Sequence, residues 1–200
     1  MKVNLKTNLV VIILTIIYGL LIVTSLFIKD GSESGTYTLL FTLDIGLKTL
    51  FALLLFYLTR VLIAFNEKKS IVIAFIMYTF IQTIYLIDDI MPGLVFIGGY
   101  IFLLEMLTFL TVTYLFIQIF RIQNPHIGLS FRLFGVSIFI LFLKEMIVPM
   151  IFRNSSFLEN TNNLQFLDII KSLTILFILK RVAEFLKNRD DQSLQVSLKL

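Results

Sequence analysis

Nine ionisable side chains interrupt or border long apolar segments of this chain. A charged side chain at the centre of a bilayer costs roughly 3 kcal/mol, so such residues face a bundle interior or a water-filled cavity and pair with one another. Carboxylates there could receive cationic groups, and lysines could hold carboxylate or phosphate. The nine residues are Asp44, Lys48, Asp88, Asp89, Glu105, Lys144, Glu145, Asp168 and Lys171. They predict either a polar binding site or an ion-pair network inside a membrane bundle.

Helical spacing groups several of these residues on shared faces. Asp44 and Lys48 are four residues apart, so they can pair along one helix. Lys144 points about 100° away from its neighbour Glu145 around a helix axis. One apolar segment carries a polar and aromatic face at steps of four, three and four residues, formed by Tyr78, Gln82, Tyr85 and Asp89.

The candidate ligand-binding set therefore draws on five apolar segments. Its twelve members are polar or aromatic and fall in one half of the expected membrane domain: Asp44, Lys48, Tyr78, Gln82, Tyr85, Asp89, Glu105, Lys144, Glu145, Asp168, Lys171 and Ser172. Asp88 and Asp89 stand at a segment boundary, where solvation by water is an alternative to pairing. The first apolar segment contains no charge, so we expect it to lie at the periphery and face lipid.

The composition of the chain indicates that these residues are carried by transmembrane helices. The chain is 58% apolar and 15% charged, with a mean hydropathy of +0.95, whereas soluble domains average about 25% charged residues. A bilayer core needs about 20 apolar residues in a helix. The sequence predicts an all-α bundle of six transmembrane helices in one domain, residues 1–187, followed by a short tail, 188–200. The expected spans are 9–28, 37–65, 70–87, 94–120, 133–152 and 165–186. We expect residues 9–28 to form the first of these spans and not a cleaved signal peptide.

Basic residues predict the orientation. With the N-terminus inside, twelve of the seventeen Lys and Arg residues fall at the inner face, and only Lys29 and Arg153 fall in outer loops. The positive-inside rule then puts both termini in the cytoplasm. The abundance of Ile, Leu, Phe, Lys and Asn with few Ala is typical of an AT-rich bacterial genome, which favours the bacterial inner membrane.

The chain lacks the residues that several classes of enzyme and metal site require. The chain has no cysteine and one histidine, His126, next to Pro125 in a predicted cytoplasmic loop. Neither a zinc-protease nor a serine-hydrolase motif occurs. We therefore expect no catalytic residue, no metal, no cofactor and no enzymatic activity, with an aspartate-based membrane enzyme as the minor alternative, since Asp88 and Asp89 resemble half of an aspartate-rich metal site. The net charge of +4 follows from the basic inner face, so we expect no nucleic-acid partner.

The function expected from this pattern is non-enzymatic. We favour a sensory, regulatory or partner-coupled membrane subunit with an outward-facing polar pocket. A small transporter or oligomeric channel for ions or polar solutes is one alternative, and a scaffold held by a closed ion-pair network is another. The partners expected are the lipid bilayer, a further copy of the chain, or a protein that docks on the C-terminal tail. The segment 192–200 alternates enough to add a short strand to such a partner.

Overall fold

The computed structural model describes residues 3–29, 36–91, 100–151 and 167–197. These residues form helices and no strand, so the all-α prediction is confirmed. The six helices are α1 (Leu5–Lys29), α2 (Thr36–Ala64), α3 (Lys69–Ile90), α4 (Tyr100–Ile119), α5 (Gly128–Ile151) and α6 (Asp168–Ser197).

Local signals account for some of the helix ends. At the start of α1, the backbone N–H of Thr7 donates to Asn4 Oδ1 at 2.8 Å, and the backbone N–H of Asn4 donates to Thr7 Oγ1 at 3.1 Å. Such a reciprocal cap satisfies N–H groups that have no partner within the helix. Beyond α2, Asn66 adopts a φ of 55°, a left-handed conformation that Asn tolerates better than most residues. The chain then turns directly into α3.

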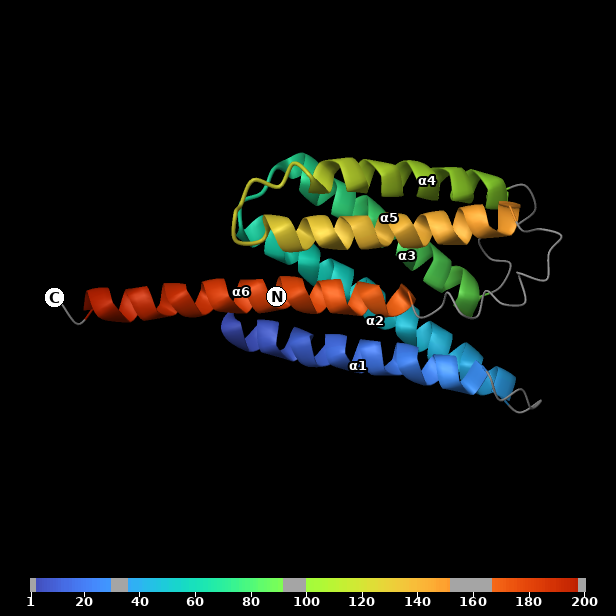
Figure 1. The fold of residues 1–200 in the computed structure, drawn as a ribbon, viewed down its shortest axis with the longest axis horizontal. Coiled ribbons are helices and arrows are strands. Elements are labelled where there is room, and N and C mark those ends of the chain that lie inside the picture. The colour runs from blue at the N-terminus through green and yellow to red at the C-terminus, as the bar shows by residue number, and fades with distance from the viewer. Residues whose placement is uncertain (1–2, 30–35, 92–99, 152–166, 198–200) are drawn as a thin grey trace.

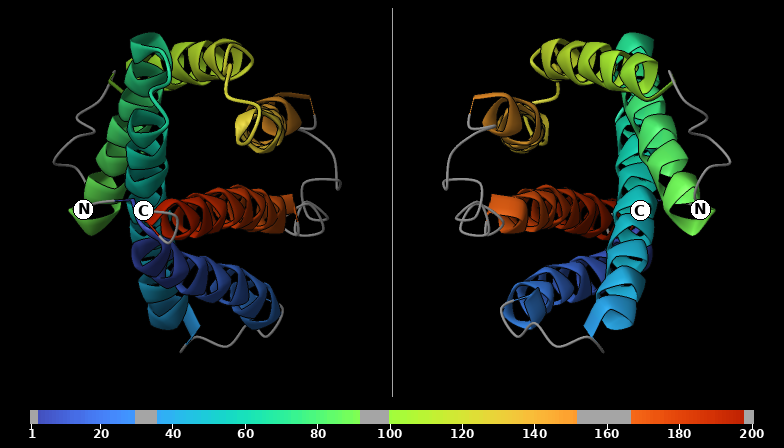
Figure 2. Two further views of the ribbon diagram at one scale, coloured as in Figure 1. Left: turned by 90° about the vertical axis from the view of Figure 1, so that its left-hand side faces the viewer. Right: turned by 90° about the vertical axis from the view of Figure 1, so that its right-hand side faces the viewer.

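The helices form a ring in chain order. Each helix packs against its neighbours in sequence, and α6 packs against α1 (Figures 1 and 2). Short connections make successive helices antiparallel. α1 lies between α2 and α6 in this ring, and it buries Val11, Tyr18 and Ile22. The rest of its surface, which includes Leu9, Ile13 and Leu20, is exposed and apolar, as expected for a helix that faces lipid.

The outside of the ring is apolar over most of its length. Large exposed side chains include Leu20, Leu53, Phe80, Leu110 and Leu173, and a soluble protein rarely exposes so continuous an apolar surface. Among the described residues, four segments are long and apolar enough to cross a membrane: Leu5–Ile28, Thr38–Ala64, Lys69–Ile90 and Phe102–Ile119. These helices indicate a membrane protein.

One half of the ring is filled by a dense apolar core. The ring of Phe75 stacks on Phe134 at 6.1 Å between centroids and meets Phe131 edge-on at 5.6 Å. Leu58 and Leu115 are also almost fully buried there. Close-packed interiors of this kind leave little room for water or ligand.

The two turns at this packed end are joined by Glu67. Its carboxylate accepts hydrogen bonds from the backbone N–H groups of Asn124 at 3.0 Å and Gln123 at 3.4 Å. Bonds to a charged acceptor are stronger than neutral ones. The turn between α2 and α3 therefore holds the turn between α4 and α5 in place.

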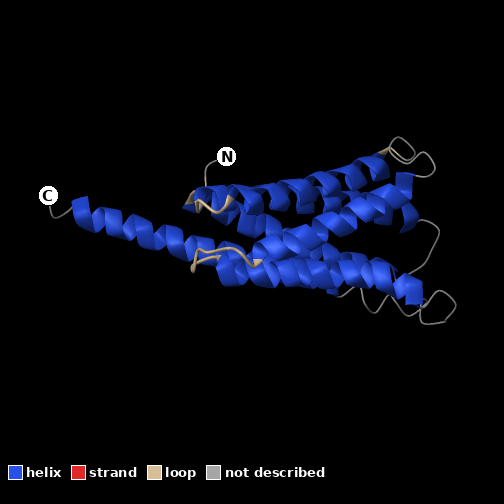
Figure 3. Ribbon diagram, turned by 90° about the horizontal axis from the view of Figure 1, so that it is seen from above, coloured by secondary structure: helices blue, strands red, loops and turns tan. Residues whose placement is uncertain are grey.

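The last helix extends past the others. α6 runs without a break to Ser197 and protrudes beyond the ring (Figures 1 and 3). The boundary expected at residues 187 and 188 falls inside this helix, and residues 192–197 are helical rather than extended. Residues 198–200 lie outside the described part of the chain.

Candidate functional site

A large cavity occupies the half of the ring opposite the apolar core. Its volume is about 1120 Å³, and side chains from all six helices line it. Ten of the twelve residues in the candidate set are among its lining residues: Asp44, Lys48, Tyr78, Gln82, Tyr85, Glu105, Lys144, Glu145, Asp168 and Lys171. The faces predicted from helical spacing therefore converge on one space.

One ion-pair cluster joins α2 and α3. Lys48 Nζ lies 2.8 Å from Asp44 Oδ2 and 2.5 Å from Asp89 Oδ2. Asp89 is thus paired across two helices, so solvation by water is not needed to explain it. Its neighbour Asp88 has a buried carboxylate oxygen with no hydrogen-bond partner among the described residues.

A second cluster joins α5 and α6. Asp168 lies between two lysines, with Oδ1 at 3.2 Å from Lys171 Nζ and Oδ2 at 3.6 Å from Lys144 Nζ. Both lysine side chains are less than one-fifth exposed. Lys171 Nζ also lies 5.5 Å from the centre of the Phe51 ring, a position in which the ring face attracts a cation.

The two clusters have inverse composition. Two carboxylates share one ammonium between α2 and α3, and one carboxylate lies between two ammonium groups at α5 and α6. Glu105 and Glu145 also line the cavity. Within the described part of the chain, neither has a basic nitrogen within 4.0 Å. The cavity therefore offers acceptors beyond those used to balance its own lysines.

Tyrosine and phenylalanine side chains form one wall. Phe51 stacks on Tyr18 with ring centres 5.9 Å apart and meets Tyr78 edge-on at 6.4 Å. On the α4 side, the hydroxyl groups of Tyr85 and Thr108 are hydrogen-bonded at 3.0 Å. Aromatic pairs of this kind stabilise a rigid surface, against which a ligand could pack.

Ser172 lies apart from the lining residues. It is buried, and its hydroxyl donates to the carbonyl oxygen of Thr15 on α1 at 3.2 Å. The hydroxyl oxygen of Ser172 lies 2.6 Å from the position that a Cβ on Gly19 would occupy. Ser172 therefore belongs to the contact between α1 and α6.

Sequence reasoning missed part of the lining. Tyr18 comes from the first helix, where a single tyrosine among apolar residues gives no charge signal. Its step to Ile22 and Ser25 at four and seven residues is the helical spacing that could have indicated an inward face. The apolar lining residues Met106, Phe109, Ile138, Leu141 and Phe142 have no distinguishing pattern among so many apolar neighbours.

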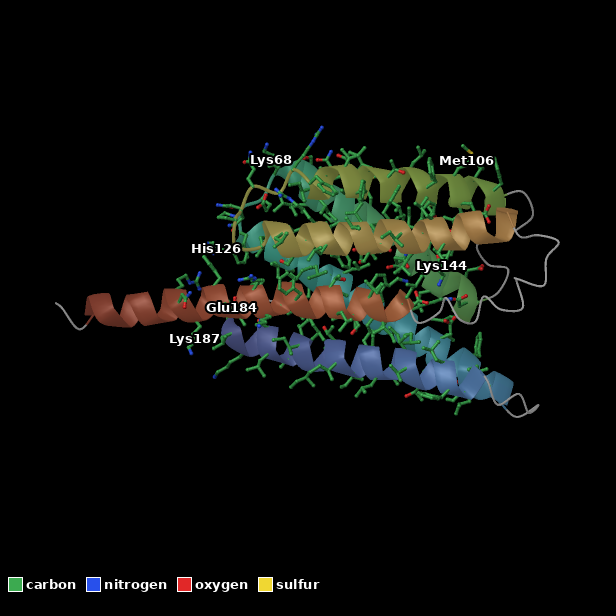
Figure 4. The ribbon with its side chains drawn as sticks, in the orientation of Figure 1. Lys68, Met106, His126, Lys144, Glu184 and Lys187 are labelled. Carbon is green, nitrogen blue, oxygen red and sulfur yellow. The ribbon has the colours of Figure 1, made fainter. Side chains whose placement is uncertain are left out.

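The charged side chains that line the cavity are carboxylates and ammonium groups. The described residues contain no group of three or more His, Cys, Asp and Glu side chains that could hold a metal ion. His126 lies near the other end of the bundle from Lys144 (Figure 4). The charged side chains of the cavity can attract, orient and desolvate a polar molecule.

Comparison with known proteins adds no further assignment. A scan against protein-family models found no match, and searches of curated proteins and of solved structures found none either.

Proposed function

We propose that this chain is an integral membrane protein with six spanning helices, whose cavity binds a polar or zwitterionic ligand and whose α6 relays the bound state to a partner. The observation that carries the proposal is a space of about 1120 Å³ surrounded by ionisable side chains at membrane depth. Small-molecule sites usually occupy about 300–1,000 Å³. A bundle stabilised only by a closed ion-pair network would gain packing energy by filling that volume.

The orientation proposed is that of a bacterial inner-membrane protein with both termini in the cytoplasm. Its support is the placement of basic residues: Lys68, Lys69 and Arg121 lie in or beside the turns at the packed end. The positive-inside rule places such an end in the cytoplasm. The charged cavity then belongs to the outer half of the bundle.

The charge distribution supports a zwitterionic ligand. The ammonium of Lys171 lines the cavity 3.2 Å from Asp168 Oδ1 and over the Phe51 ring, a position from which it can attract an anionic ligand group at α6. Glu105 supplies a carboxylate with no basic nitrogen within 4.0 Å among the described residues, which favours a cationic group near α4. Opposite charges on the ligand and the wall would offset part of the desolvation cost of burying either group alone.

Coupling to a partner would use α6. This helix begins at Asp168 in the cavity and continues through 30 residues to Ser197 beyond the other helices (Figure 3). A shift of α6 at the cavity would therefore move a surface at the opposite end, and a rigid helix is a known element of such coupling. The partner that contacts this surface would be a second copy of the chain or another protein.

A transporter is the second candidate, and one observation favours it. The cavity occupies one half of the bundle, while Phe75, Phe131 and Phe134 close the other half. This asymmetry is what one state of an alternating-access cycle requires. Flux into liposomes that depends on Glu105 and Lys171 would favour transport, or an oligomeric channel, over a receptor.

Cysteine labelling tests whether the cavity is water-filled. The natural chain has no cysteine, so Met106→Cys and Leu107→Cys can be compared with no background. Both side chains are exposed and lie at the same depth on α4, but only Met106 lines the cavity. We expect a membrane-impermeant maleimide added to intact cells to modify the first and spare the second. Protection of both would instead support the ion-pair scaffold.

A further inference from the structure

A second, smaller cavity lies at the packed end of the bundle, where the turn between α4 and α5 meets the distal half of α6. Its volume is about 270 Å³, just below the range of about 300–1,000 Å³ for drug-sized ligands. The side chains that matter for recognition are His126, Ser130, Arg181, Glu184, Phe185 and Asn188. Figure 4 shows His126 and Glu184 at this end and Lys144 toward the other, so the two cavities are separate.

The wall of this cavity is held by aromatic contacts. The Phe185 ring lies 5.1 Å from the His126 ring and 4.8 Å from the Phe65 ring, measured between centroids. The turn that carries His126 is also fixed by the hydrogen bond from the Asn124 N–H to Glu67 at 3.0 Å. A preformed wall lowers the ordering cost of binding.

Arg181 supplies most of the donors. One guanidinium nitrogen lies 3.3 Å from Glu184 Oε2, which is the single carboxylate that approaches it among the described residues. A guanidinium has five N–H donors, so four remain for a ligand. The Phe177 ring lies 5.4 Å from Arg181 Cζ, and this contact helps to orient the planar group.

The surrounding charge is positive. Glu184 is the one acidic side chain that lines this cavity in the described structure, and it is half exposed, so it can turn toward water. Exposed basic side chains on the same end of the bundle include Lys68, Lys69, Arg121, Arg132, Lys180 and Lys187. A field of this sign concentrates anions.

We propose that this second cavity is a binding site for a phosphate group. Arg181 would bind two phosphate oxygens through paired N–H groups, the geometry that its planar fork matches. The His126 ring and the Asn188 amide would supply further donors. The same chemistry serves a phosphorylated lipid headgroup and a free phosphate or phosphorylated metabolite. The inference stands independently of the ligand proposed for the larger cavity.

Thermal unfolding of the full-length protein in an uncharged detergent tests the site. One arm adds inorganic phosphate against sodium chloride at equal ionic strength, which removes general screening effects. The other adds dioctanoyl phosphatidic acid against dioctanoyl phosphatidylcholine. Stabilisation by the phosphatidic acid alone identifies a lipid headgroup as the source, and stabilisation by inorganic phosphate identifies a soluble one. Failure of both to raise the unfolding temperature overturns the proposal.

Two variants are expected to change the affinity for the phosphate probe in opposite directions. Arg181→Gln should weaken binding of the effective probe by about tenfold or more, because bonds to a charged partner are lost. Glu184→Gln should tighten it, because a competing carboxylate is removed. The matched control Lys180→Gln removes a neighbouring charge that does not line the cavity and should leave affinity nearly unchanged. If Lys180→Gln and Arg181→Gln lower the affinity for the probe equally, the binding comes from diffuse surface charge, and the proposed site is contradicted. If Arg181→Gln does not fold, unchanged affinity in Glu184→Gln contradicts the proposal by itself.

Discussion

Lys48 and Asp89 form an ion pair between α2 and α3, with Nζ and Oδ2 separated by 2.5 Å. The same ammonium holds Asp44 one turn earlier on its own helix, at 2.8 Å. The α5–α6 cluster has the inverse composition, in which one carboxylate, Asp168, holds two lysines. In each cluster a single shared ion pairs with two ions of opposite sign, so we expect loss of the shared residue to cost more stability than loss of either partner.

The shared ion of the α2–α3 cluster can be removed by Lys48→Met. This change leaves two carboxylates without a cation, so we expect it to lower the free energy of unfolding by about 2 kcal/mol, between the values for exposed and buried pairs. Asp44→Asn and Asp89→Asn each leave Lys48 with one carboxylate and should cost less than about 1 kcal/mol. Thermal unfolding in detergent gives the ranking. A smaller loss in Lys48→Met than in Asp89→Asn would contradict this account of the cluster.

Asp168→Asn is the corresponding change between α5 and α6. It removes the carboxylate that lies within 4.0 Å of both Lys144 and Lys171, which are largely buried, and removing one partner of a buried pair costs about 3–5 kcal/mol. We expect a loss of about 3 kcal/mol, larger than the loss in Lys144→Met or Lys171→Met. Partial recovery in the double variant Asp168→Asn with Lys144→Met, measured in the same unfolding assay, would support the pairwise origin. If the double variant is less stable than Asp168→Asn, repulsion between the two lysines is not the cause.

Gly19 and Ser172 mark a close approach of α1 and α6. A Cβ on Gly19 would lie 2.6 Å from Ser172 Oγ and 3.5 Å from Ser172 Cβ, so only the hydroxyl group clashes. Gly19→Ala should therefore destabilise the protein by about 1–3 kcal/mol, as overpacking does in other cores. Adding Ser172→Ala should restore most of the loss, because a Cβ at 3.5 Å is in ordinary contact. Without such recovery, the cause of the destabilisation lies elsewhere than in this contact.

Helical periodicity was sufficient to find the ionisable residues that line the cavity. Ionisable residues at membrane depth must face inward, so their spacing along each segment assigns an inward face without knowledge of the partner helix. The intrahelical pair of Asp44 and Lys48 followed from a four-residue spacing alone, and the structure confirms it. The all-helical fold followed from the length of the apolar segments.

Contacts between helices could not be predicted in the same way. The pairing of Lys48 with Asp89 depends on the register of α2 against α3, which apolar packing sets and no motif records. Ser172 was expected in the ligand-binding set, yet its hydroxyl donates to the Thr15 carbonyl oxygen of α1. The cavity at His126 and Arg181 joins a turn to a helix that is more than fifty residues away in sequence. Long-range arrangements of this kind follow from the packed fold rather than from local spacing.

The number of membrane crossings can be tested at Ser155, which lies between α5 and α6 in a segment outside the described residues. If α5 and α6 both cross the membrane, as proposed, this segment is outside the cell while both termini are inside. A cysteine at Ser155 should then react with an impermeant maleimide in intact cells. A cysteine at Lys68, in the turn before α3, should react only after the cells are permeabilised. If α5 and α6 did not cross, both positions would lie on the inner side of four spans, and Ser155→Cys would be protected as fully as Lys68→Cys. Such a result would place the ionisable residues of α5 and α6 outside the bilayer, and the ligand proposed for the cavity would lose its membrane setting.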